Sequence, residues 1–344
     1  MHTVASPLST PSAAVATPAR VAVAGATGYT GQELLRLLAR HPAARITLAT
    51  ASSAASVRNL PALAHLWDGA ITPFDADALA READLVFLAL PDEAAAELGP
   101  RLVAGGARVV DLSGAFRLRD RDVRAQWYPA TKELPGGVAY GLTELERESI
   151  RGARLVANPG CYPTPALLAL VPLAASGVLE SDTDIIVDAK SGVSGAGKSP
   201  SERTHFSEVH GSLSAYGVFG HRHGAEIEQG LGRIVTFTPH LLPIDRGLLE
   251  TIYVRVKPGT TEEQLGEVYQ NSYKGEPFVR LTGPALPEIK HVAHTNFCDV
   301  GWRVDSSGRA IIVSAIDNLL KGASGQAVQN MNAMLGVDER TGLL

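Results

Sequence analysis

The sequence contains only two cysteines among its 344 residues, Cys161 and Cys298. So few cysteines exclude a framework of structural disulfides and favour a reducing compartment, so we expect a cytoplasmic protein. The chain has no apolar run that approaches the ~18 residues a membrane-spanning helix needs. Acidic residues outnumber basic ones, 36 to 31, and the net charge is −5 with no basic run. This charge pattern argues against nucleic acid as a main partner.

The N-terminus lacks both the basic start and the long apolar core of a secretory signal. Its first 19 residues, MHTVASPLSTPSAAVATPA, are rich in Ala, Ser, Thr and Pro. We therefore predict a disordered tail over residues 1–19. The remaining length, with 45% apolar residues in the chain, is typical of two globular domains.

Strands and helices alternate from Arg20 onward, which predicts an α/β fold with a doubly wound, Rossmann-type parallel sheet. A helix with leucines at helical spacing is expected over 30–42. The strands of this first unit are expected at 20–27, 44–50, 84–90, 107–113 and 153–159.

The second half of the chain is richer in strands and predicts an α+β domain with a mixed or antiparallel sheet. One clear helix is expected near 260–273, and a last helix over 317–335 should return to the first domain. The strands are expected at 184–190, 233–240, 249–257, 291–300 and 309–317. This pattern predicts a nucleotide-binding domain over 20–160 plus 318–344 and a second domain over 161–317.

The glycine-rich stretch 25-GATGYTG-31 follows a strand and precedes a helix, which is the setting of a dinucleotide-binding loop. Its spacing differs from the usual G-x-G-x-x-G, and the alternative is an ordinary strand-to-helix turn. The second strand ends in 50-TASSAASVR-58, without the carboxylate that commonly holds the ribose of NAD. Ser52 and Ser53 can instead bind a 2′-phosphate, which favours NADP, unless this is an unrelated serine-rich loop.

The stretch 157-ANPGCYPTP-165 places Cys161 after a Pro-Gly turn and before a helix that we expect to begin with Thr164 as N-cap and Pro165 as first helical residue. A helix N-terminus lowers the pKa of a nearby thiol below its usual value of about 8.5. The alternative, a buried inert cysteine, suits Cys298 better. A nucleophilic thiol beside a nicotinamide suggests thioester formation coupled to hydride transfer.

The stretch 220-GHRHGAEIEQ-229 supplies His221 and His223 as candidate proton carriers, followed by Glu226. The two histidines form a possible metal pair. The nearby sequence has no further Cys/His cluster at ligand spacing, and this chemistry needs no metal, so we predict no metal site.

Several of these stretches resemble the N-acetyl-gamma-glutamyl-phosphate reductase family of arginine biosynthesis. The resemblance extends from about Arg20 to the C-terminus, and the cysteine and His-Arg-His motifs are its most specific parts. The matching segments, in the family's order, are GATGYTGQELLRLL, ANPGCYPT, KSGVSGAGK, HRHGAEIEQ, TPHLLPIDRGLLETIYV and DNLLKGASGQAVQN. The aspartate-semialdehyde dehydrogenases share the glycine loop and the cysteine but differ in the His-Arg-His and PHLLPIDRG segments.

The resemblance implies reduction of N-acetyl-gamma-glutamyl phosphate by NADPH to N-acetylglutamate gamma-semialdehyde and phosphate. It also implies a homo-oligomer, dimer or tetramer, with catalysis and dimerisation in the second domain. Cys161 would be the nucleophile, and His221 or His223 the acid/base. The predicted cofactor-binding residues are Gly25, Thr27, Gly28, Tyr29, Thr30, Gly31, Ser52, Ser53, Pro91, Ser191, Gly192 and Asn318. The predicted substrate-binding residues are Arg117, Asn158, Lys198, Glu226 and Arg246.

Three stretches depart from the family's usual pattern. The cysteine motif, which usually continues Thr-Gly or Thr-Ala, reads Thr164-Pro165. A stretch usually like DLSADFRL reads DLSGAFRL over 111–118, and one usually like ALPHG reads ALPDE over 89–93. The alternatives that remain are another acyl-phosphate reductase, such as aspartate-semialdehyde dehydrogenase, and a non-catalytic NADP-binding regulator.

Overall fold

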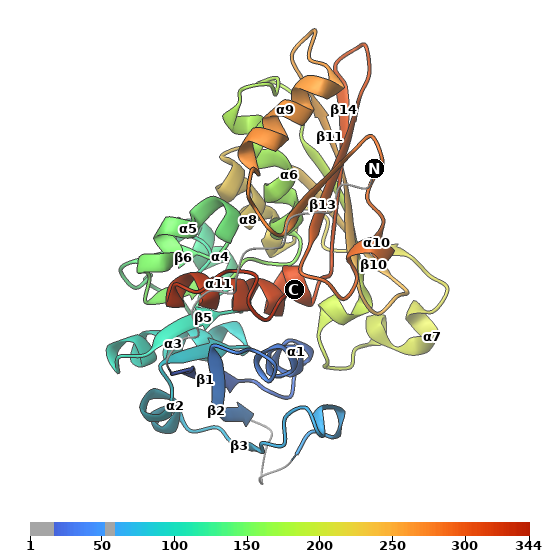
Figure 1. The fold of residues 1–344 in the computed structure, drawn as a ribbon. Helices are drawn as coiled ribbons and strands as arrows, with labels where there is room; N and C mark the ends of the chain where they lie inside the picture. The colour runs from blue at the N-terminus through green and yellow to red at the C-terminus, as the bar shows by residue number, and fades with distance from the viewer. Residues whose placement is uncertain (1–16, 52–58) are drawn as a thin grey trace, which may run out of the picture.

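The computed structural model describes residues 17–51 and 59–344, which form two seven-stranded sheets with helices packed on them (Figure 1). Residues 1–16, which make up most of the expected tail, lie outside the described residues. So do Ser52 and Ser53, the two residues expected to bind a 2′-phosphate.

The first sheet is parallel throughout, with the order β3-β2-β1-β4-β5-β7-β6, and confirms the expected Rossmann-type fold. Its strands are β1 (Ala19–Ala24), β2 (Ala44–Ala51), β3 (Ile71–Pro73), β4 (Leu85–Leu88), β5 (Arg108–Asp111), β6 (Val138–Tyr140) and β7 (Leu155–Ala157). The connecting helices are α1 (Tyr29–Leu38), α2 (Ala76–Glu82), α3 (Asp92–Ala104), α4 (Arg121–Trp127) and α5 (Thr143–Gly152), with a 3-10 turn at Pro61–Leu63.

Helices cover both faces of this sheet, which is why its strands are short and almost wholly apolar. Val21 and Val23 of β1 pack in a core with α1, α5 and the C-terminal helix α11 (Gly325–Leu335). Ala22 and Ala24 point to the opposite side and pack in a core with α2 and α3. Successive side chains of β1 thus point to opposite faces of the sheet, and helices cover both faces, as expected for a doubly wound fold.

The second sheet is mixed, as expected, with the order β12-β13-β14-β11-β8-β10-β9. The pairs β8–β10 and β12–β13 are parallel, and its other pairs are antiparallel. Its strands are β8 (Ile186–Gly192), β9 (Ser214–Ala215), β10 (Thr236–Leu242), β11 (Leu248–Arg255), β12 (Val279–Gly283), β13 (Cys298–Val304) and β14 (Arg309–Ile316).

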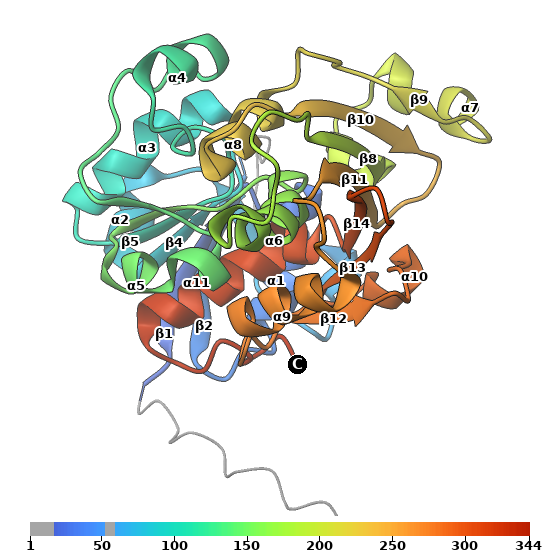
Figure 2. The ribbon, with the colours of Figure 1, turned by 90° about the horizontal axis from the view of Figure 1, so that it is seen from above.

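Three helices, α6 (Pro163–Ala175), α8 (Arg222–Leu231) and α9 (Glu262–Ser272), cover one face of the second sheet (Figure 2). The opposite face is open and exposes Ile186, Tyr253 and Ile311. Short helices α7 (Phe206–Val209) and α10 (Ile289–Val292) and 3-10 turns at Val193–Ala196 and Glu202–Thr204 complete the connections. Among the helices of residues 17–51 and 59–344, none combines the length and apolar character that a membrane span requires.

The C-terminal segment returns to the first sheet through a π-helical turn (Leu320–Ser324) and α11, as expected (Figure 1). Lys321 in this turn is fully buried, and its Nζ lies 2.6 Å from Glu144 Oε1 and 2.8 Å from Gln329 Oε1. Removing one partner of a buried ion pair leaves an uncompensated charge, at a cost of about 3–5 kcal/mol. The pair therefore fixes the returning segment on α5.

Two expectations of local structure are wrong. Helix α6 begins at Pro163, so Thr164 lies inside the helix and Tyr162 occupies the N-cap position. Pro172 lies inside this helix, which is buried on almost all sides and held by packing. Residues 291–300 do not form one strand, because α10 ends at Val292 and β13 starts only at Cys298.

Candidate active site

A cavity of about 530 Å³ lies at the carboxyl ends of β1, β4, β5 and β7, and connections from both sheets line it. This is the edge at which doubly wound sheets bind ligands. Helices α1, α3 and α8 begin in its wall, and α6 begins two residues after Cys161, which also lines it. Helix N-termini carry partial positive charge, so the cavity is suited to anionic ligands.

The glycine loop forms one wall of the cavity. Gly25 has a φ of +91°, and a side chain there would collide with the Ala89 carbonyl group. A side chain at Gly31 would likewise collide with the Gly25 carbonyl oxygen. These two glycines close the turn tightly, and Gly28 takes the N-cap position of α1. The start of α1 is thereby open to the cavity, as a bound pyrophosphate requires.

Cys161 sits in a turn that is held from two sides. The Gly160 N–H donates to Glu226 Oε1 at 2.9 Å, and the Thr164 N–H and hydroxyl both donate to the Gly160 carbonyl. A Cβ atom at Gly160 would lie 2.5 Å from His223 Nε2. Glycine at 160 therefore lets the histidine approach the backbone directly before the cysteine.

Arg117 and Glu226 form a buried ion pair beneath this turn, with Nη1 3.3 Å from Oε2. Arg117 also donates to the carbonyl groups of Asn158 and Leu112, and Glu226 accepts the Tyr140 hydroxyl at 2.7 Å. Burial opposes the charge on Arg117, but Glu226 keeps the pKa of its guanidinium above the ordinary value. Arg117 therefore stays charged beneath the turn, with Glu226 as its counter-charge.

The two histidines have different positions. His223 lines the cavity, with Nε2 3.4 Å from Arg117 Nη1, whereas His221 caps α8 by accepting the His223 N–H on Nδ1 at 3.1 Å. Both rings pack edge-on against Tyr162. Burial lowers the pKa of His221 to about 4 and that of His223 well below its usual range. Both imidazoles are therefore neutral at neutral pH.

The expected lowering of the Cys161 pKa is wrong for the ligand-free protein. Burial raises the pKa of this thiol to about 11, although Arg117 and the Tyr162 amide oppose the shift. Pro163 and Pro165 contribute no N–H to the first turn of α6, and the Thr164 N–H is already bonded to Gly160. The helix start therefore offers the thiolate less stabilisation than an ordinary one.

The predicted substrate-binding residues are only partly brought together. Arg117 and Lys198 line the cavity, and Lys198 Nζ donates to the Thr27 carbonyl of the glycine loop at 3.3 Å. Arg246 instead pairs with Glu33 at 2.5 Å and Asp317 at 3.3 Å. Asn158 is buried, donates to the Ala323 carbonyl and accepts from Asn330. Among the described residues that line the cavity, Arg246, Asn158 and Glu226 do not occur.

The predicted cofactor-binding residues fall into two groups. Six of them line the cavity: Gly28, Tyr29, Thr30, Gly31, Pro91 and Asn318. Gly25 and Thr27 lie in the same loop, whereas Ser191 and Gly192 lie deeper, where the Gly192 N–H donates to the Gly247 carbonyl. Sequence reasoning missed the lining residues Asp92, Ser113, Gly114 and Gly322. Asp92 and Gly114 lie in the two stretches, 89–93 and 111–118, that depart from the family's usual pattern, and these departures could have pointed to them.

Two family models match the chain. The semialdehyde dehydrogenase NAD-binding domain matches residues 20–153, and the semialdehyde dehydrogenase dimerisation domain matches residues 161–318. The chain is 49% identical over 336 residues to the N-acetyl-gamma-glutamyl-phosphate reductase of Syntrophobacter fumaroxidans. It is 48% identical over 338 residues to the enzyme of the same name from Pelotomaculum thermopropionicum. Each alignment covers 94% of this chain and 97% of the relative.

Solved structures with the same fold include aspartate semialdehyde dehydrogenase II of Vibrio cholerae, complexed with ASA, at a TM-score of 0.72 and 18% identity. Another is the aspartate semialdehyde dehydrogenase of Candida albicans with NADP, at 0.70 and 18%. Each similarity covers 93% of this chain and 99% of the other chain. At this identity the likeness establishes the fold.

The raised thiol pKa predicts slow alkylation of Cys161 in the ligand-free protein. With a pKa of about 11, the thiolate fraction at pH 7 is roughly 300-fold lower than for a thiol of pKa about 8.5. We expect the iodoacetamide rate, followed by mass spectrometry in Cys298→Ser, to rise with pH towards a midpoint near 11. A midpoint at or below 8.5 would show that the helix start and Arg117 outweigh burial. Cys161→Ser serves as the blank.

Proposed function

The chain belongs to the N-acetyl-gamma-glutamyl-phosphate reductase family, and we propose that Cys161 is the nucleophile of its reaction. The reaction is the reduction of N-acetyl-gamma-glutamyl phosphate to N-acetylglutamate gamma-semialdehyde and phosphate, a step of arginine biosynthesis. The single observation that supports the nucleophile is the position of Cys161. It is the cysteine that lines the cavity, beside Arg117 and His223, whereas Cys298 is fully buried.

The residues of the cavity fit a nicotinamide cofactor. The cofactor would be held by the open start of α1 at Gly28–Gly31, by Pro91 and by Asn318, which all line the cavity. Asn318 is itself held in place, because its side chain accepts the Gly247 N–H at 2.8 Å and donates to Ser194 Oγ at 2.9 Å. When bound there in reduced form, the cofactor supplies the hydride.

The Cys161 thiol gives up its proton as the sulfur attacks the acyl carbonyl carbon, the bond to phosphate breaks, and a thioester forms on the sulfur. After reduction of the thioester carbon, the carbon–sulfur bond breaks, which releases the semialdehyde and returns the proton to the sulfur. We assign the proton transfers to His223, because its neutral imidazole lines the same cavity. His221 is given no proton transfer, because its Nδ1 already accepts the His223 N–H and this bond fixes its ring. Arg117 supplies a fixed positive charge beside the sulfur, which favours the thiolate and the developing negative charge on the carbonyl oxygen.

We assign NADP rather than NAD as the cofactor on the absence of a carboxylate after the second strand. A carboxylate there would bind the ribose hydroxyls of NAD and repel a 2′-phosphate. Ser52 and Ser53, at the end of this strand in the sequence, carry hydroxyl groups that can bind a phosphate. The two free thiols suit a reducing compartment such as the cytoplasm.

Replacing Cys161 tests the nucleophile. We expect Cys161→Ala to lower NADPH oxidation with N-acetyl-gamma-glutamyl phosphate by at least about 1,000-fold, because no other thiol of the described chain lines the cavity. NADPH binding, followed by its fluorescence, should remain within about twofold. Cys298→Ser is the matched control and should keep its turnover. Near-normal turnover of Cys161→Ala would exclude the thioester route.

The assignment of the proton transfers to His223 is tested in the same assay. Turnover should fall more in His223→Ala than in His221→Ala, and the opposite order would reverse the assignment of the histidines.

Cofactor preference is tested by calorimetry. We expect NADPH to bind at least about tenfold more tightly than NADH, a difference of about 1.4 kcal/mol. Ser52→Asp and Ser53→Asp should narrow this difference by repelling the 2′-phosphate. Equal dissociation constants for the two cofactors in the unchanged protein would contradict the assignment.

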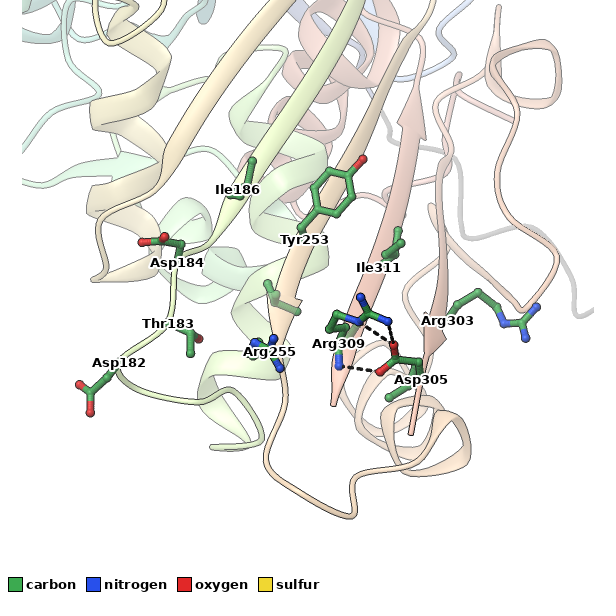
Figure 3. Close-up of a pocket in the computed structure, with 13 residues that line it drawn as sticks. Asp182, Thr183, Asp184, Ile186, Tyr253, Arg255, Arg303, Asp305, Arg309 and Ile311 are labelled. Carbon is green, nitrogen blue, oxygen red and sulfur yellow. Dashed lines mark hydrogen bonds and ion pairs between the residues drawn. The ribbon is translucent and has the colours of Figure 1, made fainter. Parts of the chain in front are cut away.

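We propose that a second copy of the chain covers the open face of the second sheet, which forms a shallow cavity of about 890 Å³ (Figure 3). Tyr253 lies in this cavity directly between its cross-strand neighbours Ile186 and Ile311, and the three side chains are 37–41% exposed. Exposed neighbouring apolar side chains on a sheet are typical of a protein interface. The match of residues 161–318 to a dimerisation domain supports this assignment.

Charges around the three side chains suit a two-fold interface. Asp182 and Asp184 lie at the β8 side of the cavity. Arg255 and Arg309 lie on β11 and β14, where Arg309 is paired with Asp305 at 2.6 Å and Arg255 is the less committed cation (Figure 3). In a two-fold dimer each copy presents the same surface, so the acidic side of one copy can meet the basic side of the other. The expected assembly is a dimer or a tetramer built from such dimers.

A charge in the middle of this face should break the assembly. We expect Tyr253→Glu to shift the mass measured by light scattering from an oligomer to a monomer, because a carboxylate would be buried without a partner. Phe74→Glu is the control, since Phe74 is equally exposed, at 42%, but belongs to the first domain. A monomeric unchanged protein, or a Tyr253→Glu variant of unchanged mass, would contradict the assignment.

A further inference from the structure

Two of the three stretches that depart from the family's usual pattern meet in the wall of the cavity. Asp92, in the stretch that reads ALPDE, accepts the N–H of Gly114 on Oδ1 at 2.6 Å. Gly114 belongs to the stretch that reads DLSGAFRL. The other carboxylate oxygen of Asp92 accepts from Arg222 Nη1, also at 2.6 Å. One carboxylate thus joins both departures to the arginine of the His-Arg-His motif, across the two domains.

Tyr128 belongs to the same group of contacts. A Cβ atom at Gly114 would collide with the Tyr128 ring, so the alanine usual in the family does not fit this arrangement. The guanidinium carbon of Arg222 lies 5.5 Å from the centre of the Tyr128 ring, within the range of a cation–π contact. Both departures therefore affect the surroundings of Arg222: Asp92 accepts its hydrogen bond, and Gly114 leaves room for the Tyr128 ring that it contacts.

Arg222 is the cavity cation with the most unused hydrogen-bond donors. Three cations line the cavity: Arg117, Lys198 and Arg222. Arg117 is buried and committed to Glu226 and two carbonyl groups, and Lys198 donates to the glycine loop. Arg222 is 47% exposed, and within the described residues its guanidinium makes one hydrogen bond, to Asp92. Four of its five N–H donors remain for a ligand.

We propose that Arg222 binds the phosphoryl group of the substrate and the phosphate that is released. Asp92 competes with the phosphate for Arg222 and so lowers the affinity of the site for phosphate. The inference rests on the proposed function, because it names the residue that meets the phosphate of that reaction. A guanidinium fork matches phosphate oxygens in a bidentate manner. Asp92 already accepts from Arg222 through Oδ2, so it competes with the phosphate for Arg222.

Removing the charge of Asp92 should raise the affinity of the site for phosphate. With Asp92 in place, the net charge of the pair is zero, and a phosphate must share Arg222 with a carboxylate. With asparagine in its place, the Gly114 N–H still has an oxygen acceptor, but the positive charge of Arg222 is no longer cancelled. Affinity for phosphate should then rise by about fivefold, the upper range for a partly exposed ion pair.

The experiment measures inorganic phosphate twice: as the dissociation constant by calorimetry with the unreacted protein, and as the KM in the reverse reaction from the semialdehyde and NADP. Arg222→Gln should raise both by about tenfold or more, since a charge-assisted pair of hydrogen bonds is lost. Asp92→Asn should lower both by about fivefold. Arg222→Lys should fall between the unchanged protein and Arg222→Gln, because it keeps the charge without the fork.

The matched controls are Arg101→Gln and Asp77→Asn. These residues form a solvent-exposed ion pair of the first domain, with Arg101 on the same helix as Asp92. Both control variants should leave the two phosphate constants within about twofold of the unchanged protein. The dissociation constant of NADPH is measured in all variants, because the cofactor also carries phosphates. It should not change in Arg222→Gln.

Three results would overturn the inference. Arg222→Gln with an unchanged dissociation constant for phosphate would exclude Arg222 as the phosphate ligand. A loss of NADPH affinity without a loss of phosphate affinity would assign Arg222 to the cofactor. Weaker phosphate binding in Asp92→Asn would mean that Asp92 positions Arg222 and does not compete. Because calorimetry needs no turnover, an inactive protein that still shows the phosphate pattern would overturn the proposed reaction alone.

Discussion

The buried ion pair of Arg117 and Glu226 is the interaction on which the active site depends. Arg117 follows β5 of the first sheet and Glu226 belongs to α8 beside the second, so the pair joins the two domains below the cavity. Through its second oxygen Glu226 also holds the N–H of Gly160, the residue before the nucleophile. Loss of either partner would bury an unpaired charge and release the turn that carries Cys161. Glu226 therefore links the turn of the nucleophile to one of the contacts between the two domains.

The cavity gathers positive charge although the pKa of the Cys161 thiol is high. The starts of α1, α3 and α8, together with Arg117, Lys198 and Arg222, direct positive charge into one space. Acidic Asp92 and Glu93 partly offset it. Burial meanwhile raises the pKa of Cys161 to about 11, so most of this thiol is protonated at neutral pH.

The sequence predicted those parts of the site that local spacing determines. The glycine loop, the cysteine turn and the His-Arg-His segment each carry their meaning within a few residues, and Gly28, Cys161 and His223 indeed line one cavity. Contacts between distant segments could not be found in this way. Arg246 is paired with Glu33 across 213 positions, and Asn158 bonds Asn330 across 172. Both residues look available in the sequence, because nothing near them shows that their hydrogen bonds are already used.

Because of the prolines that follow Cys161, side chains contribute more than the start of α6 to stabilising negative charge at the reacting carbonyl. Neither Pro163 nor Pro165 has an N–H, and the Thr164 N–H is bonded to Gly160, so the first turn of α6 has no spare donor there. Of the amides around the sulfur, those of Cys161 and Tyr162 donate to no carbonyl within residues 17–51 and 59–344, and Tyr162 already favours the thiolate. A tetrahedral oxygen on the Cys161 adduct can therefore use these two amides, one of which also bonds the sulfur, but it gains no donor from Pro163, Thr164 or Pro165. The permanent charge of Arg117, fixed by Glu226, has to supply what the helix start does not.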